Sequence, residues 1–205
     1  KPNPVVGAIL EKDGEIISEG YHKLFGHRHA EINALSSAEK LKNIKFNSFS
    51  ELTLICTLEP CSHIGKTGSC ADAIVKSGIK RVIIGSVDPS SKVSGKGIEI
   101  LRKNNIEVEV GMHQDLVAKQ NRFFFYRHKN NMPFITVKIA SSLDGKSHYK
   151  NNERVFISSK ESREDVQLLR AEYDAILTGT NTFLNDNPRM NARVNFQVNQ
   201  PEKIL

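Results

Sequence analysis

The hydrophobic pattern opens with an apolar run that turns back on itself. Residues 5–10 are apolar, Asp13-Gly14 is a tight hairpin signal, and residues 15–20 supply isoleucines for a return strand. Apolar residues at spacings of three then predict a helix over residues 29–41. The chain is therefore expected to begin with an antiparallel hairpin that is followed by a helix.

Beyond this helix the pattern alternates between strand-like and helix-like segments. A glycine at position 78 is suited to end one of the helices, because glycine readily adopts the left-handed conformation at a helix C-terminus. Such alternation predicts an α/β fold, with the hairpin at one edge of a sheet and helices packed on its faces. The expected strands cover residues 52–57, 81–85 and 107–110, and the expected helices cover 71–77, 97–104 and 113–126.

A second domain is expected to begin near residue 131. Basic and asparagine-rich residues precede Pro133 there, and an apolar strand is expected over 134–139. The capping-box spacing of Ser158 and Glu161 predicts a helix to about residue 171. Strands are expected over 174–178 and from about residue 201. We therefore divide the chain into domains 1–130 and 131–205, of which the second holds too few elements to close a fold alone.

Composition excludes several classes of function. The 205 residues are 39% hydrophobic and 25% charged, and they contain no apolar run long enough to cross a membrane. The net charge is +6, but basic residues alternate with acidic ones, so we expect no nucleic-acid surface. The chain starts without Met and without a signal-peptide pattern, so its true start is expected to be missing and the protein to be cytoplasmic. Its three cysteines suit metal binding better than disulfides.

The strongest chemical signal joins His29-Ala30-Glu31 to Pro60-Cys61 and Cys70. A catalytic zinc ion needs three protein ligands from nitrogen and sulfur donors and an open position for water, and these residues supply that set. We expect each ligand-bearing segment to open a helix, where the helix dipole favours the thiolate. Glu31 would then move the proton between the water and a leaving amine.

Two other interpretations of the same residues remain. A structural zinc module would close the ligand shell with a fourth donor such as His63. A nucleoside or nucleic-acid base deaminase would share the zinc ligands and Glu31, but those enzymes typically show Pro-Cys-x-x-Cys, whereas eight residues separate Cys61 from Cys70 here. His27 is a weaker ligand candidate, and Cys56, inside a predicted strand, is expected in the core.

The wider motif resembles that of one family, the bifunctional deaminase and reductase of riboflavin biosynthesis. The likeness covers nearly the whole chain, and Gly68-Ser69 stand where the family usually has two prolines. The matching segments are Pro2-Asn3-Pro4, Gly20-Tyr21-His22, His29-Ala30-Glu31, Pro60 to Cys70, Val87-Asp88-Pro89, Lys138 to Gly145, Leu169-Arg170-Ala171 and Asp186 to Arg189.

The resemblance implies both a fold and a reaction. It implies a cytidine-deaminase-like mixed sheet flanked by helices, followed by the start of a dihydrofolate-reductase-like α/β domain. The implied reaction removes the 2-amino group of 2,5-diamino-6-ribosylamino-4(3H)-pyrimidinone 5′-phosphate as ammonia, with Zn²⁺ as cofactor. The reductase half would use NADPH to open the ribosyl group. The implied partner is this small phosphoribosyl substrate, with no nucleic acid or membrane, and a homo-oligomer is compatible with the family.

Further site residues follow from the family's pattern. In the first domain, the positions that match substrate contacts are Asn3, His22, Lys66 and Asp88. Lys66 lies between glycines on the loop that separates the cysteines, where a cation and free amides suit a phosphate. In the second domain, Arg154, Arg170, Met190 and Arg193 match the substrate site. The residues that match the NADPH site are Ala140, Phe156, Thr182 and Asp186.

Simpler roles compete with these assignments. Asn3 and Asp88 can make turns beside proline, Lys66 can be a solvated loop residue, and Arg170 can be an ordinary helix arginine. The chain also departs from the family at Ser90 (usually Asn), Phe156 (often Trp) and Arg154 (often Ser). Because later strands of the reductase are not in the sequence, the 205 residues are expected to have no reductase activity of their own.

Overall fold

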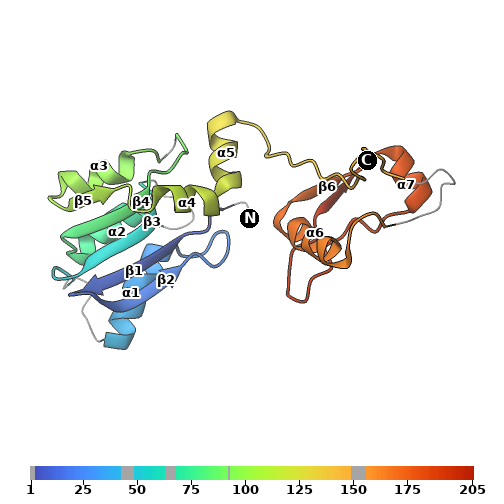
Figure 1. Cartoon of the computed structure of the whole chain (residues 1–205). Coiled ribbons are helices and arrows are strands. Elements are labelled where there is room, and N and C mark those ends of the chain that lie inside the picture. The colour runs from blue at the N-terminus through green and yellow to red at the C-terminus, as the bar shows by residue number, and fades with distance from the viewer. Residues whose placement is uncertain (1–2, 43–48, 63–67, 92, 149–155) are drawn as a thin grey trace. The chain divides into compact units, whose positions relative to one another are not determined.

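The computed structural model describes residues 3–42, 49–62, 68–91, 93–148 and 156–205. Contacts between residues divide the chain into two compact units, Lys1–Ile135 and Thr136–Leu205 (Figure 1). The division falls a few residues beyond position 131. Phe134 stays with the first unit because its ring packs edge-to-face against Phe123 and Tyr126, at 5.1 and 5.2 Å between ring centroids.

The first unit is built around a mixed sheet in the order β2-β1-β3-β4-β5. The expected hairpin forms, with β1 antiparallel to both β2 and β3, while β3, β4 and β5 run parallel. Asp13 and Gly14 make the turn at φ of 52° and 84°, the left-handed values that such a tight turn requires. The strands are β1 (Gly7–Lys12), β2 (Glu15–Tyr21), β3 (Thr53–Leu58), β4 (Arg81–Ser86) and β5 (Glu107–Val110).

Helices α1 (Ala30–Lys42), α2 (Cys70–Ser77) and α3 (Lys96–Lys103) pack on one face of this sheet. Alternate residues of the strands point to that face and meet small and aliphatic side chains from the helices. Gly78 ends α2 at φ 84°, as its C-cap role predicts. The buried cluster includes Ala8, Leu10, Ala30, Ala34, Ala38, Leu54, Cys56, Ile74, Val82, Ile84, Ile98 and Leu101. The expectation of a mixed α/β sheet flanked by helices is confirmed.

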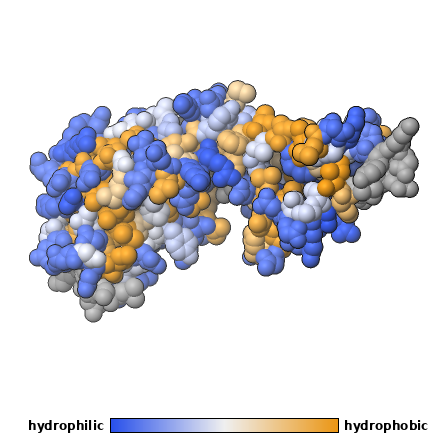
Figure 2. Space-filling model, viewed as in Figure 1, coloured by the Kyte–Doolittle hydropathy of each residue, from blue (hydrophilic) through white to orange (hydrophobic). Residues whose placement is uncertain are grey.

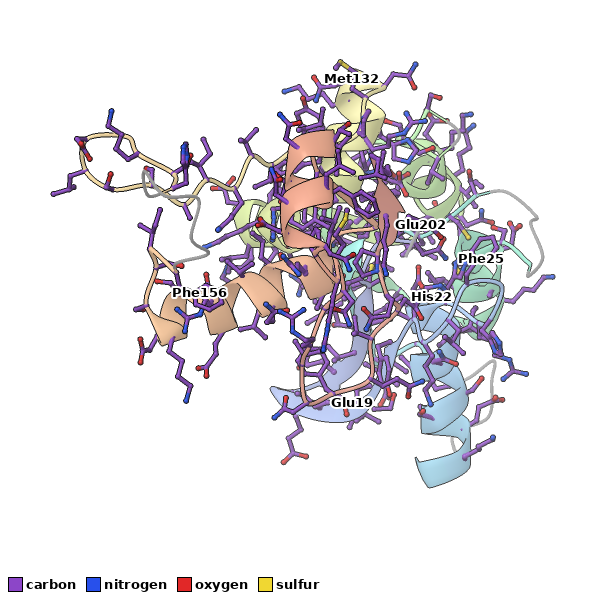
Figure 3. All side chains as sticks on the ribbon, turned by 90° about the vertical axis from the view of Figure 1, so that its right-hand side faces the viewer. Glu19, His22, Phe25, Met132, Phe156 and Glu202 are labelled. Atoms are coloured by element: carbon purple, nitrogen blue, oxygen red, sulfur yellow. The ribbon has the colours of Figure 1, made fainter. Side chains whose placement is uncertain are left out.

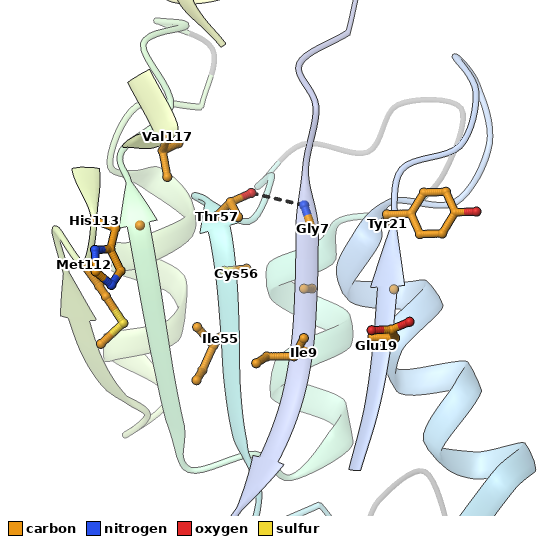
Figure 4. A pocket seen from close by; sticks show the side chains of 13 residues that line it. Gly7, Ile9, Glu19, Tyr21, Ile55, Cys56, Thr57, Met112, His113 and Val117 are labelled. Carbon is orange, nitrogen blue, oxygen red and sulfur yellow. Dashed lines mark hydrogen bonds between the residues drawn. The ribbon is translucent and has the colours of Figure 1, made fainter. Parts of the chain in front are cut away.

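The opposite face of the sheet contains a cavity of about 400 Å³. Ile9 and Ile55 line it side by side from neighbouring strands, and the amide of Gly7 donates to Thr57 Oγ1 at 3.1 Å (Figure 4). Val117, in α4 (Gln114–Gln120), borders this cavity. The cavity therefore lies on the face of the sheet opposite to α1, α2 and α3.

The helix expected over 113–126 is interrupted at Asn121. The structure has α4 and then α5 (Arg122–Asn130), and the buried Asn121 lies between them. Its side-chain amide accepts from Val5 N at 2.7 Å and donates to Val5 O at 3.0 Å. These two bonds fasten the junction of α4 and α5 to the N-terminal segment. The prediction of one continuous helix is wrong because a contact distant in sequence outweighs the local helical pattern.

The second unit contains α6 (Lys160–Glu172), β6 (Ala175–Leu177), α7 (Thr180–Asp186) and β7 (Glu202–Ile204). β6 and β7 pair in parallel, so the strands expected near 174–178 and after residue 201 both form. Ser159, not Ser158, caps α6, because its hydroxyl accepts from Ser162 N at 3.2 Å. The pattern did not predict α7. Apolar residues reach the surface of both units (Figure 2).

The strand expected over 134–139 does not form. This stretch is irregular, and Ile135, Val137 and Ile139 are 72%, 77% and 74% exposed. A strand needs a hydrogen-bonded neighbour, and residues 134–139, which cross the boundary between the two units, pair with none of the described strands. None of the helices in the described ranges has the length and apolarity needed to cross a membrane.

Gly20 allows α1 to approach β2 closely. A Cβ at this position would lie 2.3 Å from Ala34 N and 2.4 Å from Ala30 O, both backbone atoms of α1. Gly20→Ala should therefore lower the free energy of unfolding by about 1–3 kcal/mol, the usual cost of overpacking, in urea denaturation. Gly7→Ala is the matched control, because its Cβ would meet only Thr57 Cγ2, at 4.0 Å. Equal stability of the two variants would contradict the close approach.

Candidate metal centre

The structure brings the side chains of His29, Cys61 and Cys70 together. The ligand atoms of these residues all lie within 4.8 Å of one another. His29 Nδ1 is 3.5 Å from Cys61 Sγ and 3.3 Å from Cys70 Sγ. The three groups therefore converge on one point, although they are far apart in sequence.

These distances fit a zinc ion. A tetrahedral centre with Zn–S of about 2.3 Å and Zn–N of about 2.0 Å places nitrogen and sulfur ligands about 3.5 Å apart. The two separations from Nδ1 agree with that value. Both thiols are free of disulfides, so they can act as ligands. Among the described residues, which omit 63–67, the cluster has three protein donors and leaves the fourth position of a tetrahedron open.

Two of the three ligands lie at helix N-termini. His29 immediately precedes α1, and its carbonyl accepts the helical bond from Asn33 N at 3.0 Å. Cys70 is the first residue of α2, after the N-cap Ser69. Cys61 differs from the expectation, because it lies after β3 and neither it nor Ser62, the last described residue before position 68, is helical. That loop is held to the start of α2, where Ala71 N donates to Cys61 O at 3.1 Å.

Hydrogen bonding and burial shift the pKa values of the two thiols in opposite directions. The hydrogen bond from Cys70, together with those from His29 and the Cys70 amide, lowers the pKa of Cys61 to about 4. The same bond and burial raise the pKa of Cys70 well above its usual range. The hydrogen bond to Cys61 also raises the pKa of His29. Cys61 is thus readily available as a thiolate, the form that binds metals.

Glu31 lies beside these donors in the first turn of α1. Its side chain is only 3% exposed, and among the described residues its Oε2 has no hydrogen-bond partner. Burial, partly offset by a bond to its own backbone amide, raises the pKa of the carboxyl to about 7. A buried carboxyl with a free oxygen and a pKa near neutrality can both accept and return a proton.

Asn3 and His22 are bonded to each other, and His22 contacts His29. Asn3 Nδ2 donates to His22 Nε2 at 2.7 Å, while His22 Nδ1 donates to the carbonyl of Arg28 at 3.2 Å. The rings of His22 and His29 contact edge-to-face, with centroids 5.2 Å apart. Figure 3 labels His22 in the segment that leads from β2 to α1. His22 therefore lies next to a metal-ligand candidate, and Asn3 is bonded to His22.

Asp88 lies in the loop after β4 and is 8% exposed. Its Oδ1 accepts from Ser90 N at 2.7 Å. This bond forms a turn, the simpler role that the sequence suggested for Asp88. Burial raises the pKa of Asp88, the bond from Ser90 N partly offsets this, and the charge of Glu59 raises the pKa further. The residue thus combines a turn with a backbone bond to Glu59, because Asp88 N donates to Glu59 Oε2 at 3.2 Å.

In the second unit, three of the expected substrate residues lie around one backbone segment. Arg170 donates to the carbonyl of Asn191 at 3.2 Å, and Arg193 donates to the Oδ1 of the same residue at 2.9 Å. Burial, then the charge of Arg193, lowers the pKa of Arg170. Met190 is buried, at 4% exposure. The two guanidinium groups are therefore close enough to bind one anion.

The residues expected near NADPH lie on separate segments. Phe156 precedes α6, with the guanidinium of Arg163 4.4 Å from its ring centroid (Figure 3). Thr182 and Asp186 lie one turn apart on α7 and are exposed, and Ala140 lies in the irregular stretch before residue 149. Lys66, His63 and Arg154 lie outside the described residues.

Asn121 and Asn33 support the site in ways the sequence pattern did not predict. Asn121 fastens Val5, two residues after Asn3, to the junction of α4 and α5. Asn33 Nδ2 donates to the carbonyls of Tyr21 and Arg28 and so holds the ends of the loop that contains His22. An asparagine inside a predicted helix is a weak signal of this kind, because its side chain competes with helical bonding.

By its fold and its three convergent donors, the first unit is similar to the zinc-binding region of deaminases. The family model of the cytidine and deoxycytidylate deaminase zinc-binding region matches residues 1–86, and the model of the RibD C-terminal domain matches residues 133–205. Over its full length the chain is similar to the RibD family of riboflavin biosynthesis proteins.

Relatives and solved structures agree with this family. The chain is 43% identical over 205 residues to the riboflavin biosynthesis protein RibD of Aquifex aeolicus, and 41% identical over 193 residues to that of Escherichia coli strain K12. The first alignment covers 100% of this chain and 55% of the relative, and the second covers 94% of this chain and 50% of the relative. The chain thus spans about half the length of these relatives.

The structure of a diaminohydroxyphosphoribosylaminopyrimidine deaminase/5-amino-6-(5-phosphoribosylamino)uracil reductase from Thermotoga maritima aligns with a TM-score of 0.88 at 41% identity. RibD of Acinetobacter baumannii aligns with a TM-score of 0.87 at 39% identity. Each alignment covers 99% of this chain and 56% of the solved one. The cytidine-deaminase-like fold class is therefore confirmed.

Removal of either thiol ligand should empty the metal centre. Cys61→Ser and Cys70→Ser should each lose most of the roughly one zinc ion per chain that a three-donor site binds, because a hydroxyl is a poor substitute for thiolate. Elemental analysis after dialysis measures the loss. Cys56→Ala is the control, since this buried cysteine bonds to Ile83 O and not to the cluster. Retention of zinc by either serine variant would mean that another group is the ligand.

Proposed function

We propose that the first unit deaminates 2,5-diamino-6-ribosylamino-4(3H)-pyrimidinone 5′-phosphate. Water adds at C2 of the ring and the 2-amino group leaves as ammonia, so that the ring gains an oxo group. The observation that carries this proposal is the buried Glu31 carboxyl beside the convergent donors of His29, Cys61 and Cys70. The names of the relatives in Aquifex aeolicus and Thermotoga maritima support riboflavin biosynthesis as the setting.

The proposed roles follow from position. A zinc ion bound by His29, Cys61 and Cys70 would supply Lewis acidity that makes water a nucleophile near neutral pH. Glu31 accepts the proton of the attacking water at Oε2 and passes it to the departing amine. Its burial excludes bulk water from this carboxyl, and its raised pKa suits a group that must hold the proton and then release it.

Asn3, His22 and Asp88 are proposed to bind the substrate. Asn3 and His22 are joined by a hydrogen bond, the ring of His22 packs against His29, and Asp88 N donates to Glu59, two residues before Cys61. Side chains held in this way can orient a ring over the donors without large rearrangement. Lys66 remains proposed as the phosphate contact on the strength of the sequence resemblance.

Two alternatives have less support. A nucleoside or nucleic-acid base deaminase would share the donors, but the long spacing between Cys61 and Cys70 and the relatives above favour the riboflavin substrate. A structural zinc module needs a fourth protein ligand, and within the described ranges the cluster contains three. The catalytic interpretation therefore accounts for more of the residues.

For the second unit we propose the first part of an NADPH-dependent reductase that acts on the deaminated product. The match to the RibD C-terminal domain supports this assignment. Arg170 and Arg193, which both bind Asn191, are proposed to hold an anionic group of the substrate together with Met190 and Arg154. Ala140, Phe156, Thr182 and Asp186 are proposed to contact NADPH.

We also propose the domain limits 1–130 and 131–205 and a cytoplasmic location. The end of α5 at Asn130 supports the limit. The cysteines, all three free, suit a reducing compartment.

Glu31→Gln should keep its zinc and lose deamination by about a hundredfold or more, because the ligands are unchanged while the proton can no longer be transferred. Elemental analysis and ammonia release measure the two properties. Glu39→Gln, two turns further along α1, is the matched control and should remain active. Turnover near that of the unchanged chain would refute the assigned role of Glu31.

The function itself is tested by incubation of the zinc-loaded chain with the diaminopyrimidinone ribotide. Ammonia should appear in step with loss of the substrate, and a chelator should abolish its release, because the donors alone do not activate water. Cytidine and deoxycytidylate serve as comparison substrates. Faster deamination of either of these than of the ribotide would favour the alternative deaminase class.

A further inference from the structure

Glu59 is a buried carboxylate that the roles above do not use. It follows β3 directly, two residues before Cys61, and its side chain is 4% exposed. A carboxylate at this depth must have its oxygens bonded, because an unsatisfied buried charge is strongly unfavourable. The identity of its partners therefore shows what the residue does.

Four backbone amides donate to the Glu59 carboxylate. Oε1 accepts from Gly97 N at 3.0 Å and from Ile98 N at 3.4 Å, and Oε2 accepts from Gly95 N at 2.9 Å and from Asp88 N at 3.2 Å. An ionised carboxylate has about four acceptor sites, so these bonds satisfy it. Among the described residues, the donors to this carboxylate are backbone amides and include no lysine or arginine side chain.

Three of these amides belong to the N-terminus of α3. Gly95, the N-cap residue, makes no side-chain capping bond of its own. Glu59 thus caps α3 from a different element, and its negative charge lies at the positive end of the helix dipole. A Cβ on Gly97 would lie 2.0 Å from Pro60 O, which shows how closely α3 approaches the segment that leads to Cys61.

The fourth amide belongs to Asp88, the proposed substrate contact. The backbone of Glu59 also takes part, since its N donates to Ser86 O at 2.9 Å. Glu59 therefore binds the chain on both sides of Val87. Its amide binds Ser86 before that residue, and its carboxylate binds Asp88 after it. One residue connects the loop that contains Cys61 to the loop that contains Asp88.

We infer that Glu59 is a positioning residue that sets Asp88 relative to Cys61, so that a substrate held by Asp88 meets the metal centre correctly. This inference rests on the proposed function. Glu59 contacts neither donors nor substrate in this account. It acts through its bond to the Asp88 backbone, so loss of Glu59 should weaken substrate binding only while Asp88 is present.

Glu59→Gln is the main test. The glutamine NH₂ replaces one acceptor oxygen and faces amide donors, so that two of the four bonds are lost. Zinc content should match that of the unchanged chain, while KM for the ribotide should rise about tenfold or more, as expected when hydrogen bonds to a charged group are broken. Amide hydrogen exchange over residues 88–98 should accelerate. Glu99→Gln, on the exposed side of the same helix, is the matched control.

A double-mutant cycle with Asp88→Ala separates positioning from general damage. If Glu59 acts through Asp88, the double variant should bind the ribotide no more weakly than Asp88→Ala alone, because interacting residues are not additive. Affinities are measured by calorimetry in the Glu31→Gln background, where the ribotide is not consumed. Additive losses would overturn the inference, as would loss of zinc from Glu59→Gln. Should Glu59→Gln fail to fold, Glu59→Asp, which keeps the charge but has a shorter reach, enters the same cycle.

The two levels of the account can fail separately. A zinc-loaded chain that neither binds nor deaminates the ribotide would refute the proposed function. A chain that does both, and whose Glu59→Gln variant has the same KM and the same exchange over 88–98, would refute only the role of Glu59.

Discussion

The arrangement of the metal centre depends on α1 and α2 packing on the same face of the sheet, with their N-termini beside the loop that follows β3. Small side chains, Ala30, Ala34 and Ala38, let α1 lie close to the strands, and Gly20 removes the Cβ that would block it. His29 and Cys70 enter the site from the two helix starts. Cys61 reaches it from the loop. The positions of the donors are thus a consequence of core packing.

The same packing creates the electrostatic conditions of the site. Glu31 lies in the first turn of α1 and is buried with the helix, and its raised pKa follows from that burial. The pKa of Cys61 is shifted in the opposite direction, because hydrogen-bond donors converge on its sulfur and lower it. A thiolate ligand and a carboxyl able to carry a proton therefore occur side by side in one buried region. Few chemical groups are needed, but each must be held by the fold.

The sequence was informative where the signal was local. The hairpin at Asp13-Gly14, the Gly78 cap and the strand periodicity all correspond to elements in the structure. The His-x-Glu and Pro-Cys spacing named the residues that the structure brings together. These features depend on neighbouring residues and on simple metal chemistry, and both can be read from the chain itself.

Features that depend on distant partners could not be predicted. The clamp of Asn121 on Val5 spans 116 positions and breaks a helix that the local pattern favours. The stretch 134–139 has a strand's pattern, but it crosses the boundary between the two units and pairs with none of the described strands. Nothing local distinguishes Glu59 from a surface glutamate, because its four amide partners come from residues 88–98. In each case the deciding interaction forms only in the folded chain.

X-ray absorption at the zinc K-edge of the metal-loaded chain tests the central claim most directly. The account predicts two sulfur ligands at about 2.3 Å, a single imidazole nitrogen at about 2.0–2.1 Å and one further light ligand that exchanges with solvent. A second imidazole in place of that light ligand would show a closed, structural site and would contradict the account.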